Sequence, residues 1–241
     1  MQKNTNSSSP IVFEHVGKIY GSPESPALKD VSFAIKEGEF ACFVGPSGAG
    51  KSTVLKIIAG LETQSSGKVE KPERVGMVFQ SGALFPWLTV FDNVALGLRV
   101  LHIPENAARN EANASIAMMG LTDFFDKYPR ELSGGQRQRV GIARAIALDP
   151  MVLLLDEPFS SLDIKTSEEL HKDILTIWRQ RKKTIVMVSH SIEEAVALAD
   201  RVIVMNDFTV RRIVPIELPR PRHDQGPAFH QEVLRIRKEF F

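Results

Sequence analysis

The stretch Gly45-Pro46-Ser47-Gly48-Ala49-Gly50-Lys51-Ser52 decides the fold of this chain, together with the two apolar segments that flank it. The run Phe40-Ala41-Cys42-Phe43-Val44 before it predicts a buried strand, and residues 52–59 after it have helical spacing. The glycines let several N–H groups face one point, Lys51 adds a positive charge, and a helix N-terminus favours an anion. A triphosphate fits such a loop, with the Ser52 hydroxyl as the expected ligand of Mg2+. The alternative is a glycine-rich turn with an incidental lysine, but the strand–helix setting favours phosphate binding.

A second apolar run ends in two carboxylates. Residues 151–155, Met-Val-Leu-Leu-Leu, are followed by Asp156 and Glu157. A continuous aliphatic run predicts a buried strand of a parallel sheet, and ligands bind at the carboxyl ends of such strands. Asp156 is therefore a candidate to hold Mg2+, and Glu157 is a candidate base that polarises an attacking water. A solvated Asp-Glu turn after a core strand remains an open alternative.

The third motif, Leu132-Ser133-Gly134-Gly135-Gln136, opens a segment with helical spacing that continues to Leu148. Its first N–H groups and the Ser133 hydroxyl predict a second anion site at a helix N-terminus. One chain cannot easily direct both anion sites to the same triphosphate.

These motifs resemble those of the ATP-binding cassette (ABC) family, and the residues that carry the resemblance run from Tyr20 to His190. The resemblance implies an ATPase subunit that dimerises around two ATP molecules and drives a membrane transporter. In that family, the Leu-Ser-Gly-Gly-Gln run of one subunit covers the γ-phosphate held by the loop of the other. The implied fold is an α/β P-loop NTPase cassette with a mostly parallel core sheet, an antiparallel β subdomain and a helical subdomain.

The resemblance also implies roles for single residues. Tyr20 matches the aromatic residue that stacks on adenine, and Gln80 matches a glutamine that senses Mg2+ and the attacking water. Asp163 matches the loop between the two ATP sites, and His190 matches a histidine that contacts the γ-phosphate. A surface tyrosine, a strand-end glutamine and a structural histidine are the alternatives. The expected catalytic residues are Glu157, His190 and Gln80; the expected metal ligands are Ser52, Gln80 and Asp156; the expected ATP-binding residues are Tyr20, Gly45, Pro46, Ser47, Gly48, Ala49, Gly50, Lys51, Ser52, Thr53, Ser133, Gly134, Gly135, Gln136 and Asp163.

Two further segments bear on the partners. Residues 84–90, Leu-Phe-Pro-Trp-Leu-Thr-Val, predict a surface that receives a partner's helix, with core packing of Trp87 as the rival. Residues 218–222, Leu-Pro-Arg-Pro-Arg, together with Phe-Pro-Trp-Leu at 85–88, look like the importer group that serves nitrate, sulfonate and taurine uptake. A surface brace without substrate meaning is the alternative for residues 218–222.

Composition limits the classes of function. The formal net charge of +1 offers no basic field for nucleic acid. The single cysteine, Cys42, cannot form an internal disulfide, which is compatible with a reducing cytoplasm. No segment approaches the roughly 18 to 20 apolar residues that cross a bilayer, so a pore is expected to belong to other chains. We therefore expect a peripheral subunit at the cytoplasmic face of the membrane, with a second ATPase copy as a homodimer, integral permease subunits and, indirectly, a solute-binding protein.

The predicted organisation is a polar tail over residues 1–10 and a single ABC ATPase domain over 11–241, with its helical subdomain at about 81–148. Strands are predicted at 11–16, 31–35, 40–44, 152–155, 184–189, 202–205 and 209–214, and helices at 52–59, 89–100, 105–119, 136–148, 165–180, 192–199 and from Pro227 onward. Two other functions remain open: a soluble ABC ATPase in a process other than transport, and a regulatory P-loop module that switches with nucleotide.

Overall fold

The computed structural model describes residues 10–21, 26–222 and 226–239, so the predicted polar tail lies outside the described residues except for Pro10. The chain divides into two units. The first contains the described residues up to Glu73 and from Lys182 on, and the second runs from Arg74 to Arg181.

An antiparallel sheet of three strands begins the first unit. Its order is β2(Pro26–Ile35), β1(Ile11–Ile19) and β4(Ser66–Glu70), with β1 in the middle. Ile11, Phe13 and Val16 of β1 are buried, and the ring of Phe13 stacks on that of Phe33 at 4.5 Å between centroids. This sheet confirms the predicted antiparallel β subdomain.

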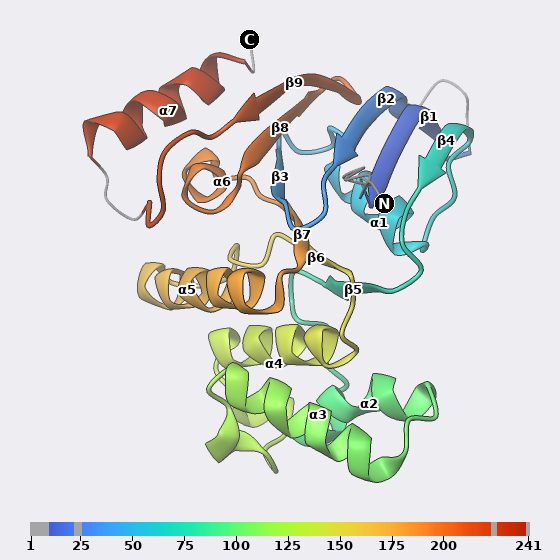
Figure 1. Ribbon diagram of the computed structural model, residues 1–241, viewed down its shortest axis with the longest axis vertical. Coiled ribbons are helices and arrows are strands. Elements are labelled where there is room, and N and C mark those ends of the chain that lie inside the picture. The colour runs from blue at the N-terminus through green and yellow to red at the C-terminus, as the bar shows by residue number, and fades with distance from the viewer. Residues whose placement is uncertain (1–9, 22–25, 223–225, 240–241) are drawn as a thin grey trace, which may run out of the picture. The chain divides into compact units, whose positions relative to one another are not determined.

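A parallel arrangement of apolar strands forms the centre of the first unit (Figure 1). The strand β3(Phe40–Val44) pairs in parallel with β7(Thr184–Val188) on one side and with β8(Arg201–Asn206) on the other, while β9(Thr209–Pro215) runs antiparallel to β8. All five residues of β3 and of β7 are buried, as expected for continuous apolar runs with both faces covered. The helices of this unit are α1(Lys51–Ala59), α6(Ile192–Leu198) and α7(Pro227–Lys238).

The second unit combines a strand pair with helices. The strands β5(Val75–Val78) and β6(Val152–Asp156) pair in parallel. Figure 1 shows the helices α2(Val90–Val100), α3(Glu105–Met118) and α4(Gly134–Ala147) packed together, followed in the chain by α5(Ile164–Arg181), with short 3-10 turns η1(Thr122–Phe124) and η2(Pro129–Glu131) between α3 and α4. The three helices predicted between residues 89 and 148 are thus confirmed to within two residues at each end. Among the described residues, no helix combines the length and the apolar character needed to cross a bilayer.

Candidate functional site

The phosphate loop joins the carboxyl end of β3 to the first turn of α1. Gly50 is the residue before the helix and has φ 96°, a left-handed conformation that favours glycine. A Cβ atom on Gly45 would lie 2.2 Å from the Met205 carbonyl oxygen of β8, so this position has no room for a side chain. The sequence therefore places glycine where the backbone turns and where two strands approach closely.

Lys51 lies inside this loop rather than in solvent. Its side chain is buried, and its ammonium group donates to the carbonyl oxygens of Gly45 at 2.8 Å and Pro46 at 2.9 Å. These bonds hold the positive charge at the amino end of α1, where the helix dipole also attracts anions. The loop is thus arranged to bind a phosphate group.

Tyr20 follows β1 and keeps part of its ring exposed. The Lys18 ammonium lies 4.7 Å from the ring centroid, where a cation is attracted by the π-electrons. Lys18 is itself held by the Glu62 carboxylate at 2.8 Å and by the Thr63 carbonyl oxygen at 2.7 Å. The hydrogen bond from Lys18 keeps the pKa of Glu62 below its usual value. Tyr20 is therefore an exposed ring with an anchored cation beside it.

His190 is exposed between two anchored serines at the end of β7. The buried Ser189 hydroxyl donates to the Glu194 carboxylate and accepts from the Ser191 N–H at 2.9 Å. The Ser191 hydroxyl in turn accepts from the Glu194 N–H at 3.1 Å and so caps α6. Neighbouring Cys42 is buried in β3, and burial together with the Glu194 charge raises the pKa of its thiol. The backbone of His190 is therefore fixed from both sides.

The two predicted acidic residues, Asp156 and Glu157, have different backbone conformations. Asp156 is the last residue of β6, whereas Glu157 has φ 49° in the left-handed region, which is uncommon for a residue with a side chain. The Ser160 hydroxyl donates to the Glu157 carbonyl oxygen at 3.1 Å and accepts from the Gln80 side-chain amide at 3.0 Å. Ser160 therefore brings the predicted glutamine to the turn that carries the predicted base.

The Leu-Ser-Gly-Gly-Gln run forms the start of α4. The Ser133 hydroxyl accepts from the Gln136 N–H at 3.2 Å, and the Gln136 side chain accepts from the Ser133 N–H at 2.9 Å. This reciprocal capping stabilises the helix start. A Cβ atom on Gly135 would lie 2.3 Å from the Thr166 methyl group, so any side chain here would displace Thr166 where α4 approaches the start of α5. Gln136, predicted to bind ATP, has its side-chain oxygen engaged in this cap.

Asp163 caps the neighbouring helix α5. Its carboxylate accepts from the Thr166 N–H at 3.0 Å and from the Thr166 hydroxyl at 2.7 Å. The hydroxyl donor holds the pKa of Asp163 below its usual value. The sequence motif did not indicate this capping role, because the partner is recognised only once the helix start is known.

The predicted partner surface, residues 84–90, is held in place by the buried side chain of Asn93 in α2. Its side chain is 0% exposed and bonds to Phe85, Leu88 and Thr89. Trp87 is 70% exposed, so core packing of this residue is wrong as an alternative. Sequence reasoning missed Asn93, and a buried-looking asparagine inside an apolar helix was the available signal.

The predicted residues divide between the units. Tyr20, residues 45–53 and His190 belong to the first, and Gln80, residues 133–136, Asp156, Glu157 and Asp163 belong to the second. A glycine loop between a buried parallel strand and a helix, with a lysine directed into the loop, defines a P-loop nucleotide-binding protein.

More narrowly, the chain belongs to the ABC transporter family, whose model matches residues 28–160, and it is an ATPase of that family. It is 43% identical over 225 residues to the nitrate import ATP-binding protein NrtD of Synechocystis sp., covering 89% of this chain and 84% of the relative. It is 40% identical over 230 residues to the aliphatic sulfonates import ATP-binding protein SsuB of Bacillus licheniformis, covering 91% and 89%. Among solved structures, the dimeric ATP-binding cassette MJ0796 in a post-hydrolysis state bound to ADP and Pi matches with a TM-score of 0.77 and 34% identity, over 87% of this chain and all of that chain. These findings confirm the resemblance and the cassette fold.

Proposed function

We propose that residues 11–241 form the ATP-hydrolysing domain of a membrane importer. Two copies bind two molecules of MgATP, close face to face, and drive uptake of a small solute through separate permease subunits. The observation that carries the proposal is the phosphate loop, where the buried ammonium of Lys51 is held by two loop carbonyls at the amino end of α1. The relatives named as import ATP-binding proteins support the importer assignment.

The residues assigned to Mg2+ suit that ion, because hydroxyl, carboxylate and amide oxygens are the ligands it prefers. Ser52 lies in the first turn of α1, Asp156 ends β6, and Gln80 follows β5. When bound, the ion neutralises charge on the phosphate oxygens. The protein's own contribution is to supply oxygen donors from rigid elements.

The remaining groups divide the chemistry of hydrolysis. Tyr20 stacks on adenine, and the loop N–H groups with Lys51 hold the phosphates. Glu157 accepts a proton from the attacking water, which Gln80 orients. His190 bonds to the γ-phosphate. The Ser160 bridge between Gln80 and the Glu157 carbonyl supports the pairing of the water-directed residues.

The second copy completes each site. Residues 133–136 of one copy bind the γ-phosphate held by the other, with Asp163 in the loop between the two sites. The helix start at Ser133 supports this role, since its N–H groups favour an anion. The dimeric ATP-binding cassette MJ0796 supports dimerisation.

The proposed partners are integral permease subunits, with a solute-binding protein acting through them, and the chain binds peripherally at the cytoplasmic face. Exposed Trp87 and the partly exposed Phe85, whose rings lie 5.6 Å apart, offer the permease an apolar surface. Relatives are named for import of nitrate, bicarbonate and aliphatic sulfonates, so we propose a small anion or sulfonate of the nitrate, sulfonate or taurine type as the solute.

The catalytic part of the proposal is tested with Glu157→Gln. Gln has almost the same shape as Glu and tolerates the same left-handed backbone about equally, so the change removes the base and little else. We expect ATP turnover to fall at least about 100-fold, the lower end of the range for general base catalysis, while ATP stays bound and the dimer accumulates in size-exclusion chromatography. The control is Glu168→Gln at an exposed position of α5. Unchanged turnover in Glu157→Gln would exclude this residue as the base.

The transport part is tested by mass spectrometry of proteins that copurify with the tagged chain in mild detergent. A membrane protein with several spans, in near-equal amount, is expected. Recovery with ribosomal or DNA-bound proteins instead would support the soluble ABC ATPase. Tight nucleotide binding without ATP turnover, in the wild type and in Glu157→Gln alike, would support the regulatory module.

A further inference from the structure

We propose that Arg220 and Arg222, here called the arginine clamp, position His190 by holding the far end of helix α6. This inference rests on the proposed contact of His190 with the γ-phosphate. The clamp comes from residues 218–222, the Leu-Pro-Arg-Pro-Arg segment whose role the ATPase chemistry leaves unexplained.

Arg222 is buried, with 6% of its surface exposed, although it follows a proline-rich segment. Its guanidinium group donates to the carbonyl oxygens of Val196 at 2.9 Å and Ala199, both at the end of α6. It also donates to the carbonyl oxygens of Leu218 at 2.7 Å and Ile216 at 3.0 Å. Burial lowers the pKa of Arg222 to about 10, so the group is charged at neutral pH. The alternative of a brace therefore fits this residue, although the brace is buried rather than at the surface.

Arg220 adds a second contact to the same helix end. Its guanidinium group donates to the Leu198 carbonyl oxygen and to the Asp200 carboxylate, the latter at 2.6 Å. The other oxygen of Asp200 accepts from the Phe40 N–H at 2.9 Å. Phe40 is the first residue of β3, the strand that leads into the phosphate loop. The clamp is thus connected to both α6 and β3.

Helix α6 needs such support because it has only seven residues. A helix of this length is unstable alone, and its last carbonyl groups have no partner inside the helix. The two guanidinium groups satisfy three of these carbonyls, those of Val196, Leu198 and Ala199. They also place positive charge at the negative end of the helix dipole.

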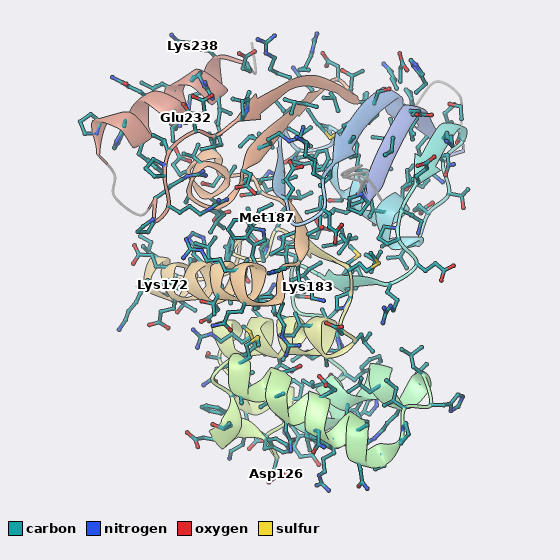
Figure 2. All side chains as sticks on the ribbon, viewed as in Figure 1. Asp126, Lys172, Lys183, Met187, Glu232 and Lys238 are labelled. Carbon is teal, nitrogen blue, oxygen red and sulfur yellow. The ribbon has the colours of Figure 1, made fainter. Side chains whose placement is uncertain are left out.

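Helix α7 supports α6 from the side (Figure 1). Arg237 of α7 forms an ion pair with Glu193 of α6 at 3.1 Å. Figure 2 shows Glu232 on α7, and this residue pairs with Arg235, which also donates to the Pro215 carbonyl oxygen of β9 at 2.6 Å. These contacts make α6 and the chain's last helix one assembly within the first unit.

The near end of α6 determines where His190 lies. Ser189 and Ser191, on either side of His190, both bond to Glu194 in the first turn of α6. A displacement of α6 therefore moves Glu194, both serines and His190 together. Because His190 acts at the γ-phosphate in the proposed mechanism, loosening the clamp is expected to lower the rate of hydrolysis more than the affinity for ATP.

The test is a double-mutant cycle with Arg222→Met and His190→Ala, in which kcat and KM for ATP are measured at a temperature where each variant is folded by circular dichroism. Arg222→Met alone is expected to lower kcat about 10-fold and to change KM less than 2-fold, on the order of one misplaced catalytic contact. In the His190→Ala background the same change is expected to lower kcat less than 2-fold, since the two residues act as one. The control, Arg212→Met at an exposed position of β9, is expected to keep both constants.

Equal loss of kcat from Arg222→Met in both backgrounds would overturn the inference, because a residue that acts only through stability does not depend on His190. If Arg222→Met does not fold, Arg222→Lys takes its place in the cycle, since one ammonium group cannot bond to four carbonyls. Wild-type kcat in a folded Arg222 variant would also overturn it. Unchanged kcat in His190→Ala would overturn the proposed role of His190 itself. If kcat falls in His190→Ala but Arg222→Met lowers it equally in both backgrounds, only the inference about the arginine clamp is overturned.

Discussion

Replacement of Asn93 by alanine is expected to release the apolar loop at residues 85–89 without changing any exposed side chain. The Asn93 side-chain oxygen accepts from the Phe85 N–H at 2.9 Å. Its amide group donates to the carbonyl oxygens of Phe85, Leu88 and Thr89 at 3.2, 3.0 and 2.9 Å. One buried side chain therefore holds both ends of the loop that presents Trp87.

The free-energy cost of Asn93→Ala follows from these hydrogen bonds. An amide group has two hydrogens, so its three acceptors share two donated bonds, and the accepted bond makes a third. At about 1 kcal/mol for each net hydrogen bond, Asn93→Ala costs about 3 kcal/mol. That value corresponds to a change of about 100-fold in the equilibrium between the closed and open loop.

Hydrogen–deuterium exchange with mass spectrometry measures this equilibrium directly. A peptide covering residues 82–92 is expected to exchange about 100-fold faster in Asn93→Ala than in the wild type, and permease-stimulated ATPase activity is expected to fall with it. Asn110→Ala, at an exposed position of α3, is the matched control and should exchange normally. Wild-type exchange in Asn93→Ala would show that the buried amide does not hold the loop.

Three further changes have defined outcomes. Gly50→Ala is expected to weaken ATP binding by roughly 1 to 3 kcal/mol in a fluorescent-nucleotide titration, because its Cβ would lie 2.5 Å from the Ala27 carbonyl oxygen at a φ of 96°; an unchanged Kd would contradict the steric argument. Ser133→Ala removes the cap of α4 and is expected to lower the free energy of unfolding by about 1 kcal/mol in denaturant titration, with no loss if water replaces the hydroxyl. Thr166→Val removes the hydroxyl that lowers the pKa of Asp163, so that pKa, followed by NMR, should rise towards its ordinary value of about 3.9. A carboxyl group whose pKa is lower in the folded than in the unfolded state stabilises the fold at pH values above its unfolded-state pKa, and this contribution is lost as the pH falls. The difference in the free energy of unfolding between Thr166→Val and the wild type should therefore be present at pH 7 and shrink below about pH 4. A difference that stays constant with pH would indicate lost packing instead.

The parts of the fold that were predictable are those in which the local pattern and the burial agree. The runs at 40–44, 152–155 and 185–188 are continuously apolar and become the buried parts of the parallel strands β3, β6 and β7. The strand β4(Ser66–Glu70) was missed, because Ser-Gly-Lys-Val-Glu is polar and mostly exposed. It is a strand only because β1 pairs with it, and this tertiary pairing overrides weak local propensity.

The bounds of β1 and β2 show a second limit of prediction from the sequence. The prediction ended the first strand at Val16 and began the second at Val31, whereas β1 continues to Ile19 and β2 begins at Pro26. His15 and Asp30 have φ values of 52° and 48°, and their side chains bond to each other at 2.6 Å. The pairing is irregular beside these residues, so the alternation that reveals a strand is interrupted there.

The residues of the candidate site also divide into those predictable from local sequence and those that only the fold reveals. The phosphate loop and the Leu-Ser-Gly-Gly-Gln run are contiguous, so their backbone roles follow from local sequence. Lys18, Asn93 and Arg222 were not predicted, because their roles depend on the folded surroundings. Arg222 bonds to Val196, 26 residues away, and nothing within the Leu-Pro-Arg-Pro-Arg segment identifies that partner.

Cys42 has a practical consequence for spectroscopy. It is the single cysteine of the chain and is 0% exposed within β3, with a thiol whose pKa is raised by burial. Thiol-reactive probes are electrophiles that an accessible thiolate attacks, so they should leave the native protein unlabelled. One cysteine introduced at an exposed position such as Asn110 would then carry a spin label or fluorophore alone, and the distance between labels on two copies would report dimer closure without a cysteine-free background.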